Sequence, residues 1–112
     1  MLTTVQTHND LSIISINARR LDASIALAFK DEVLELIHQG ESRILLNLNN
    51  IEFIDSSSLG AIVSLLKAMN GRGVLALCEL NDSVKNMFKL TRMDKVFTIY
   101  DSENAALHQL LN

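Results

Sequence analysis

Three serines directly after an aspartate form the most chemically distinctive stretch of the sequence. Asp55, Ser56, Ser57 and Ser58 stand at the start of an apolar segment that begins with Leu59. Aspartate and serine cap helices, because their side-chain oxygens accept hydrogen bonds from the free amides of the first turn, and one such residue is enough. Capping therefore explains one of these four polar residues. A functional site that uses the serine hydroxyls is the alternative explanation for the others.

The sequence lacks the partner residues that would make one of these serines a catalytic nucleophile. A nucleophilic serine needs a base in hydrogen-bond reach, but His8 lies in the expected N-terminal hairpin, His38 at the end of the first expected helix and His108 in the last one. The serines do not form a G-x-S-x-G motif, and the sequence contains no H-E-x-x-H, paired cysteine or P-loop motif. We therefore predict no catalytic residue, no metal site and no cofactor, and we interpret the single Cys78 as a buried thiol.

Ser56 is instead a candidate acceptor of a phosphoryl group from another protein. Phosphorylation adds about −1.5 to −2 charge and three acceptor oxygens. A helix N-terminus tolerates that charge, since its free amides and dipole favour an anion. At an interface the same charge beside Asp55 would be repelled by acidic groups and would cost desolvation. Modification could therefore break a complex without unfolding the domain.

Composition narrows the classes of protein to which this chain could belong. Its 112 residues suit one domain, and 48% hydrophobic residues with no proline exclude a disordered or fibrous chain. The ten basic and thirteen acidic residues give a net charge of −3 without a basic stripe, which argues against direct binding of nucleic acid. No apolar run approaches the ~18 residues of a membrane span, and the first residues lack a signal segment. We expect a cytoplasmic protein.

Hydrophobic periodicity and polar punctuation predict alternating strands and helices. The expected order is an antiparallel hairpin of strands 3–7 and 11–16, a helix capped within 22–24 and ending at Gln39, strand 43–48, helix 55–70, strand 74–80, a helix capped within 81–83, strand 96–100 and a helix capped by 101–102. This order indicates a single α/β domain over residues 1–112, with a mixed, mainly parallel sheet of four to five strands and about four helices. The loops 20–24, 49–58 and 81–83 follow strands and form the expected working edge.

The helix expected over residues 55–70 is apolar on more than one side. Its core stripe is expected at Leu59, Ile62, Val63, Leu66 and Met69, whereas Ala61, Leu65 and Ala68 lie off that stripe. A solvated helix normally carries a polar opposite face. This helix is therefore either flanked by neighbouring helices or presents apolar surface to a partner.

With these residues in view, the sequence resembles the STAS domain family, and specifically the small stand-alone anti-sigma factor antagonists of bacteria. The segment ILLNLNNIEFIDSSSLGAI is similar to the family's strand, loop and D-S-[ST]-G-L-G helix start, and LDAS and LTRMDKVFTIYDS also agree. The resemblance implies a non-enzymatic protein that captures an anti-sigma serine kinase when it is unphosphorylated. It further implies that the kinase phosphorylates the domain and that a metal-dependent phosphatase resets it.

Carried over to this chain, the resemblance places the phosphoacceptor at Ser56. It implies a phosphorylation-site pocket formed by Asp22, Asp55, Ser57 and Ser58. The implied partner-binding surface consists of Leu21, Asp22, Ser24, Asp55, Ser56, Ser57, Leu59, Gly60 and Val63. One departure is that Ser58 stands where the family usually has glycine, so a side chain is present where a partner or a helix entry would otherwise meet bare backbone.

Two other classes of function stay open at the level of sequence. The same domain type resembles subunits of bacterial lipid or anion transport assemblies, in which it would regulate a membrane complex. An enzyme or nucleotide sensor is suggested only by Asp22, Asn47, Asp55 and the serines, if they converge on one polar pocket.

Overall fold

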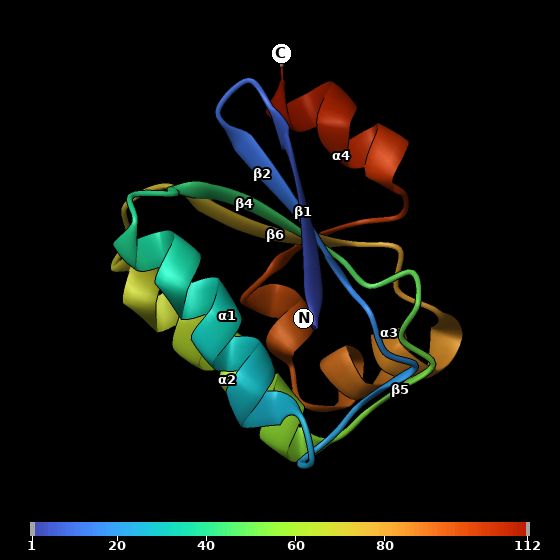
Figure 1. Cartoon of the computed structure of the whole chain (residues 1–112). Coiled ribbons are helices and arrows are strands. Elements are labelled where there is room, and N and C mark those ends of the chain that lie inside the picture. The colour runs from blue at the N-terminus through green and yellow to red at the C-terminus, as the bar shows by residue number, and fades with distance from the viewer. Residues whose placement is uncertain (1, 112) are drawn as a thin grey trace.

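A five-stranded sheet forms the centre of the computed structural model, which describes residues 2–111 (Figure 1). The strands lie in the order β1-β2-β4-β6-β7, with bounds β1 Thr3–His8, β2 Leu11–Ile16, β4 Arg43–Asn47, β6 Val74–Cys78 and β7 Thr98–Tyr100. β1 is antiparallel to β2, and every other neighbouring pair in this sheet is parallel. The predicted mixed, mainly parallel sheet and the N-terminal hairpin are confirmed.

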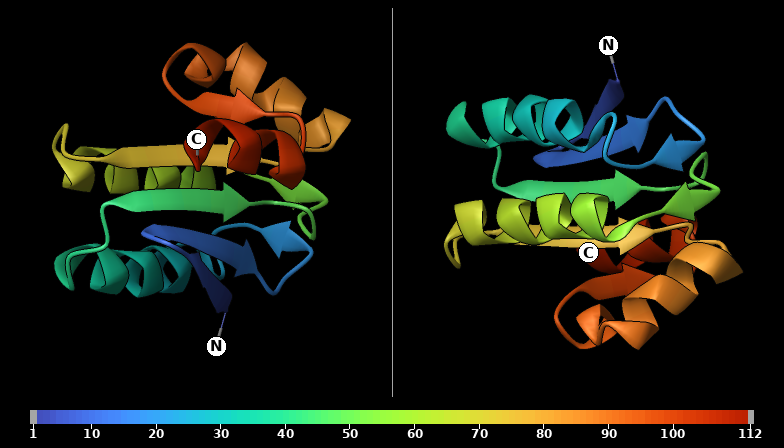
Figure 2. Two further views of the ribbon diagram at one scale, coloured as in Figure 1. Left: turned by 90° about the horizontal axis from the view of Figure 1, so that it is seen from above. Right: turned by 90° about the horizontal axis from the view of Figure 1, so that it is seen from below.

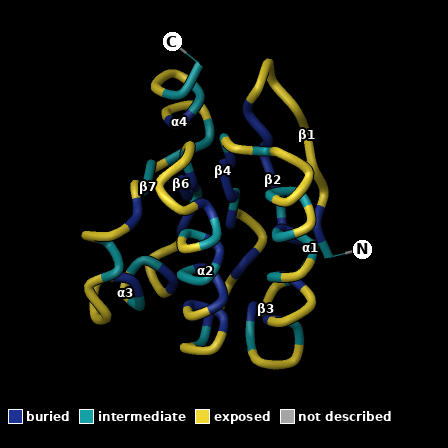
Figure 3. Tube along the Cα trace, turned by 90° about the vertical axis from the view of Figure 1, so that its left-hand side faces the viewer, coloured by how far each residue is buried: buried dark blue, intermediate teal, exposed yellow. Residues whose placement is uncertain are grey.

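Four α-helices cover the two faces of the sheet, as the sequence predicts. α1 (Ala26–His38), α2 (Ser56–Met69) and α3 (Asp82–Leu90) lie on one face, and α4 (Glu103–Leu110) lies on the other (Figures 1 and 2). Strand residues alternate between these faces: Ile44 and Leu46 pack with the first three helices, whereas Leu45 packs with α4. The central strands are consequently buried on both sides and appear as the dark interior of Figure 3.

Cys78 belongs to this interior, as predicted. Its side chain is fully buried in the cluster beneath α4. Burial, together with the carboxylates of Glu103 and Glu79, raises the pKa of the thiol to about 12. A thiol that stays protonated and enclosed fills space in the core and is a poor nucleophile.

A second, two-stranded ribbon was not predicted. β3 (Arg20–Leu21) pairs in parallel with β5 (Phe53–Ile54), with Arg20 opposite Phe53 and Leu21 opposite Ile54. Each strand has only two residues, which is too short for an alternating pattern to stand out in sequence. The ribbon matters because it joins the two loops that precede α1 and α2.

The last strand is shorter than predicted, and a 3₁₀-helix, η1 (Met93–Lys95), precedes it. The amides of Val96 and Phe97 both donate to the carbonyl of Met93, so the backbone there is still turning. Val96 is 50% exposed, and extended pairing begins only at Thr98.

The core face of α2 also differs from the predicted stripe. Ala61 and Leu65 are buried, whereas Val63 and Leu66 are only half-buried. The reason is the position of α1, which runs beside α2 and covers part of the side that sequence periodicity left open (Figure 1). Of the two alternatives given by the sequence, the structure shows the flanking helix.

Candidate functional site

The Asp55 carboxylate joins the start of α2 to the loop that precedes α1. Its Oδ1 accepts hydrogen bonds from the Ser58 amide at 2.9 Å and the Ser57 hydroxyl at 2.7 Å. Its Oδ2 accepts from the Ala23 amide at 3.0 Å. Asp55, one of the four residues that could cap this helix by sequence, is therefore the cap of α2, and the expected proximity of the Asp22 loop to Asp55 is confirmed. The amide of Ala23 is a member of the site that sequence reasoning missed, because backbone donors carry no residue-type signal.

Asp22 organises its own loop in a similar way. Its Oδ1 accepts from the Ser24 amide at 3.0 Å and from the Ser24 hydroxyl at 2.6 Å, and its Oδ2 lies 3.4 Å from Arg20 Nε. The predicted cap of α1 is wrong in one respect, since Ile25 occupies the N-cap position without a side-chain cap. Asp22 instead stabilises the turn just before the helix, where its carbonyl accepts from the amides of Ile25 and Ala26.

Hydrogen bonding keeps both carboxylates ionised. The Ser58 amide, then the Ser57 hydroxyl and the Ala23 amide, hold the pKa of Asp55 below its usual value. The hydroxyl and amide of Ser24, with a smaller contribution from Arg20, lower the pKa of Asp22. The two loops therefore present two negative charges at the surface at neutral pH.

The three serines have different surroundings. Ser56 and Ser57 are exposed in the first turn of α2, and the hydroxyl of Ser57 is held by Asp55. Ser58 is fully buried, and its Oγ has no hydrogen-bond partner among residues 2–111. Ser58 thus faces the core, which corrects its expected place in a surface pocket, and only Ser56 and Ser57 are accessible to another protein.

Two residues of the implied partner-binding surface are also inside the protein. Leu21 is fully buried and Leu59 is 5% exposed, because both pack in the core beneath α1 and α2. They position the loops and do not form contacts with a partner at the surface. Asp22, Ser24, Asp55 and Val63 are at least partly exposed, and Ser56, Ser57 and Gly60 are exposed.

A shallow groove of about 500 Å³ runs between α1 and α2, directly beside Ser57. Small side chains line most of it, with Leu27 and Lys30 at the α1 side; the lining is Ala23, Ala26, Leu27, Lys30, Ser57, Gly60, Ala61 and Ser64. Leu27 is 64% exposed. Sequence reasoning identified only Ser57 and Gly60 of this groove as partner-binding residues, because the contribution of α1 depends on how the two helices pack.

Gly60 has no structural reason within the described chain to be a glycine. It lies inside α2 without a positive φ, and a Cβ atom built on it meets nothing within 4 Å. Glycine in a helix interior is roughly 1 kcal/mol less favourable than alanine. Steric fit within the described residues therefore does not require a glycine at this position, and the backbone of α2 is left bare beside the groove.

Asn47 does not join this site, which corrects the idea of one polar pocket with Asp22 and Asp55. Its amide nitrogen donates to Glu103 Oε1 at 2.8 Å, and its side-chain oxygen accepts from the Asn49 amide. Because strand side chains alternate, Asn47 shares the α4 face with Leu45, whereas Asp22 and Asp55 precede the helices of the opposite face. Asn47 therefore does not contribute to a pocket with Asp22 and Asp55.

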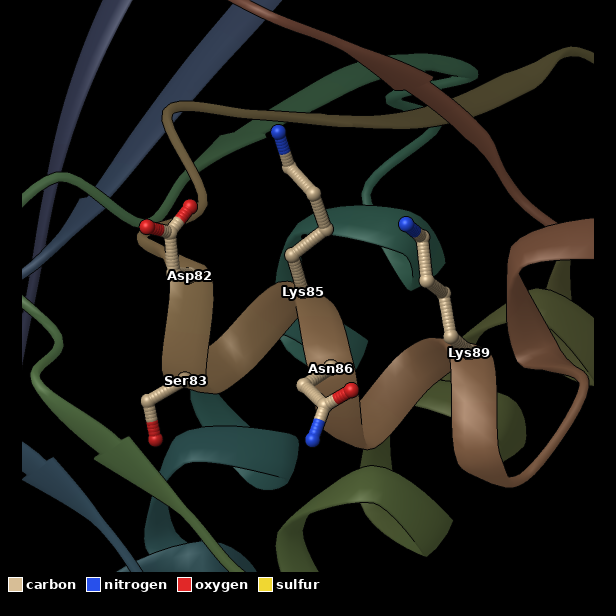
Figure 4. Close-up of a pocket in the computed structure, with 5 residues that line it drawn as sticks. All are labelled: Asp82, Ser83, Lys85, Asn86 and Lys89. Atoms are coloured by element: carbon tan, nitrogen blue, oxygen red, sulfur yellow. The ribbon is translucent and has the colours of Figure 1, made fainter.

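The start of α3 offers an instructive comparison with the start of α2. It too has a side-chain cap, Asn81, and an exposed serine, Ser83, in its first turn. Figure 4 shows Ser83 on α3 together with Asp82, Lys85, Asn86 and Lys89, and these five residues line an open, charged hollow. An exposed serine at a helix start is therefore not distinctive by itself. The start of α2 differs from that of α3 because Ser57, next to Ser56, lines the α1–α2 groove.

We expect Asp55→Ala to lower the free energy of unfolding by about 2 kcal/mol, since it removes a helix cap and the tie to Ala23. Urea denaturation at pH 7 measures this, and Ser102→Ala, which removes a single cap bond from α4, is the control and should cost less. Folding lowers the pKa of Asp55 from its usual value of 3.8. The ionised carboxylate therefore stabilises the folded protein above pH 3.8 and loses this effect as it becomes protonated at lower pH. The difference between wild type and Asp55→Ala should shrink as the pH falls below 3.8. A constant difference down to pH 2 would contradict this account.

Ser58→Ala is expected to raise the free energy of unfolding by about 1 kcal/mol. The substitution removes a buried, unpaired hydroxyl and introduces the better helix former. The matched control is Ser64→Ala on the same helix, because the Ser64 hydroxyl donates to the Gly60 carbonyl at 3.1 Å. Thermal denaturation should show a larger gain for Ser58→Ala than for Ser64→Ala, and the reverse order would mean that the Ser58 hydroxyl is satisfied.

The described part of the chain contains neither a cluster of metal ligands nor a membrane-spanning helix. Within residues 2–111, no three His, Cys, Asp or Glu side chains come together in a way that could hold a metal ion. No described helix has the length and apolar character needed to cross a membrane.

Comparison with known proteins supplies the family context. The model of the STAS domain matches residues 3–106. A Thermotoga maritima protein that is provisionally named an anti-sigma factor antagonist is 35% identical over 104 residues, which make up 91% of each chain. The crystal structure of a so-named protein from the same organism has a TM-score of 0.86 at 30% identity, covering 98% of this chain and 95% of that one.

The anti-sigma factor antagonist SpoIIAA of Bacillus has the same fold. Its unphosphorylated structure covers 98% of both chains at 17% identity with a TM-score of 0.75. Its phosphorylated structure covers 96% of this chain and 98% of that one at 16% identity, with a TM-score of 0.72. At these identities the likeness concerns the fold alone.

Proposed function

Because this chain belongs to the STAS domain family, we propose that it is an anti-sigma factor antagonist whose partner binding is controlled by phosphorylation of Ser56. In its unmodified form it binds an anti-sigma factor that is also a serine kinase, and thereby releases a sigma factor. Phosphorylation ends the complex, and a metal-dependent phosphatase restores the binding form. The protein acts in the cytoplasm and performs no catalysis itself.

The observation that carries this proposal is an exposed Ser56 at a capped helix start, directly before Ser57, which lines the open α1–α2 groove. Asp55 holds the first turn of α2 and the α1 loop together, so the backbone around Ser56 is fixed before any partner arrives. Gly60 leaves the adjacent groove open to close approach. The relatives named as antagonists support the assignment.

The proposed modification is a simple group transfer. The kinase moves the terminal phosphoryl group of ATP to Ser56 Oγ, so that an O–P bond forms at serine, the bond to ADP breaks and the hydroxyl proton leaves. The phosphatase hydrolyses the new ester with water and releases inorganic phosphate. Within the domain the added charge is tolerated, because free amides at the start of α2 favour an anion.

The experiment is affinity capture from the source organism with Ser56→Ala and Ser56→Glu baits, combined with mapping of phosphorylated residues on the wild type. We expect the Ala bait, but not the Glu bait, to retain an ATPase of the histidine-kinase type, and we expect phosphate on Ser56. Phosphate on Ser57 alone would move the site by one residue. Retention of transporter subunits by both baits, with Ser56 unmodified, would replace this proposal with the transport function left open by the sequence.

A further inference from the structure

Arg20 is paired with Phe53, three residues before the proposed phosphorylation site, and its side chain is only loosely held. Its guanidinium lies over the ring of Phe53, 4.2 Å from the centroid, and its Nε is 3.4 Å from Asp22 Oδ2. The Arg20 side chain is 62% exposed. Exposed ion pairs and cation–π contacts contribute little to stability, so the guanidinium can exchange these contacts for a better anion.

The backbone brings Arg20 to the same edge of the fold as Ser56. Arg20 is paired with Phe53 in the β3–β5 ribbon, and Ser56 follows Phe53 by three residues. The loop after Arg20 is tied to the loop before Ser56 by the hydrogen bond from Ala23 to Asp55. The flexible arginine side chain thus begins next to the segment that ends at Ser56.

The charges at this edge favour a nearby counter-ion once Ser56 is modified. Asp22 and Asp55 already supply two negative charges, and phosphoserine adds about −1.5 to −2 more. Lys30 lies on the groove side. Arg19 extends from the ribbon to Glu52, with 3.7 Å between Nε and Oε2, and is 84% exposed. Arg20 is the guanidinium that already contacts a carboxylate of the site.

We propose that Arg20 is the counter-ion of phosphorylated Ser56, and that its guanidinium leaves Asp22 and the Phe53 ring to bind the phosphoryl oxygens. A guanidinium suits this role because its planar fork of N–H donors pairs with phosphate in a bidentate manner. The proposal rests on the proposed phosphorylation of Ser56 and adds how the modified state is organised. It also makes the β3–β5 ribbon responsive to phosphate, since the Phe53 ring is uncovered when Arg20 moves.

The test uses protein in which phosphoserine is installed at position 56 during synthesis, so that no kinase is needed. A ³¹P NMR titration then follows the second ionisation of the phosphate in wild type, Arg20→Gln, Lys30→Gln and the matched control Arg19→Gln. A nearby cation favours the dianion, so Arg20→Gln should raise the pKa of the phosphate by roughly 0.5 or more, and Arg19→Gln should leave it unchanged. In wild type, the Nε–Hε resonance of Arg20 should shift on phosphorylation, and that of Arg19 should not.

Two outcomes of the titration would overturn the proposal. A rise in the phosphate pKa with Lys30→Gln but not with Arg20→Gln would assign the counter-ion to α1, and no rise with any variant would mean a fully hydrated phosphate. The shift of the Arg20 Nε–Hε resonance is measured in the wild-type protein, so it still tests the proposal if a variant fails to fold. An unchanged resonance on phosphorylation would overturn the proposal. Because the phosphate is installed synthetically, absence of Ser56 phosphorylation in cells would overturn the proposed function while leaving this result unaffected.

Discussion

Ser56→Glu is expected to bind the anti-sigma factor at least ~100-fold more weakly than Ser56→Ala, which is a difference of ~2.7 kcal/mol. The acidic side chain would lie next to the carboxylates of Asp22 and Asp55, on the exposed first turn of α2. A partner that accommodates these two carboxylates has no compensation for a third charge and must desolvate it. Alanine removes only a hydroxyl, so Ser56→Ala should bind as wild type does.

Calorimetric titration of the identified anti-sigma factor with both variants gives the two dissociation constants. Ser83→Glu is the matched control, because Ser83 is an exposed serine in the first turn of another side-chain-capped helix (Figure 4). It should keep wild-type affinity. Circular dichroism and thermal unfolding should be nearly the same for all three variants, since a helix start tolerates an acidic residue. Equal affinities of Ser56→Glu and Ser56→Ala would remove the switch from the proposed function.

The fold was predictable because its main elements are long and strongly patterned. Buried strands β4 and β6 appear in the sequence as nearly continuous apolar runs, and the caps Asp55, Asn81 and Ser102 are polar residues of the preferred types. The β3–β5 ribbon and η1 were not predictable in this way. They have two or three residues each and depend on contacts with distant parts of the chain.

The sequence allowed a prediction of which loops come together at the site, but not of the directions of their side chains. Loops that follow neighbouring parallel strands meet at one edge, which brought the Asp22 and Asp55 loops together in the prediction. Residue type alone could not show that Ser58 turns inward or that Asn47 lies on the opposite face of the sheet. The position of a residue within its helix or strand decides which way its side chain points. An error of one residue in the predicted strand register would place a side chain on the opposite face of the sheet.

Gly60→Gln is expected to stabilise the protein and to abolish most of its partner binding. Glutamine is a much better helix former than glycine, and the space around the Gly60 Cβ position is open, so the free energy of unfolding should rise by ~0.5 kcal/mol or more. The same side chain would project from α2 at the α1–α2 groove, where the proposed partner approaches the backbone. We expect the dissociation constant to increase at least ~100-fold.

These opposite changes distinguish an interface residue from a structural one. If Gly60 were needed for folding, substitution would lower stability, and any loss of binding would follow from unfolding. Gly60→Ala should raise the free energy of unfolding more, by about 1 kcal/mol, because alanine is the better helix former. Its loss of affinity should be smaller, because a methyl group protrudes less. Ser83→Gln adds the same side chain to α3 and should leave affinity unchanged. Wild-type affinity of Gly60→Gln for the anti-sigma factor would show that the partner does not enter this groove, and the absence of a side chain at position 60 would then need another cause.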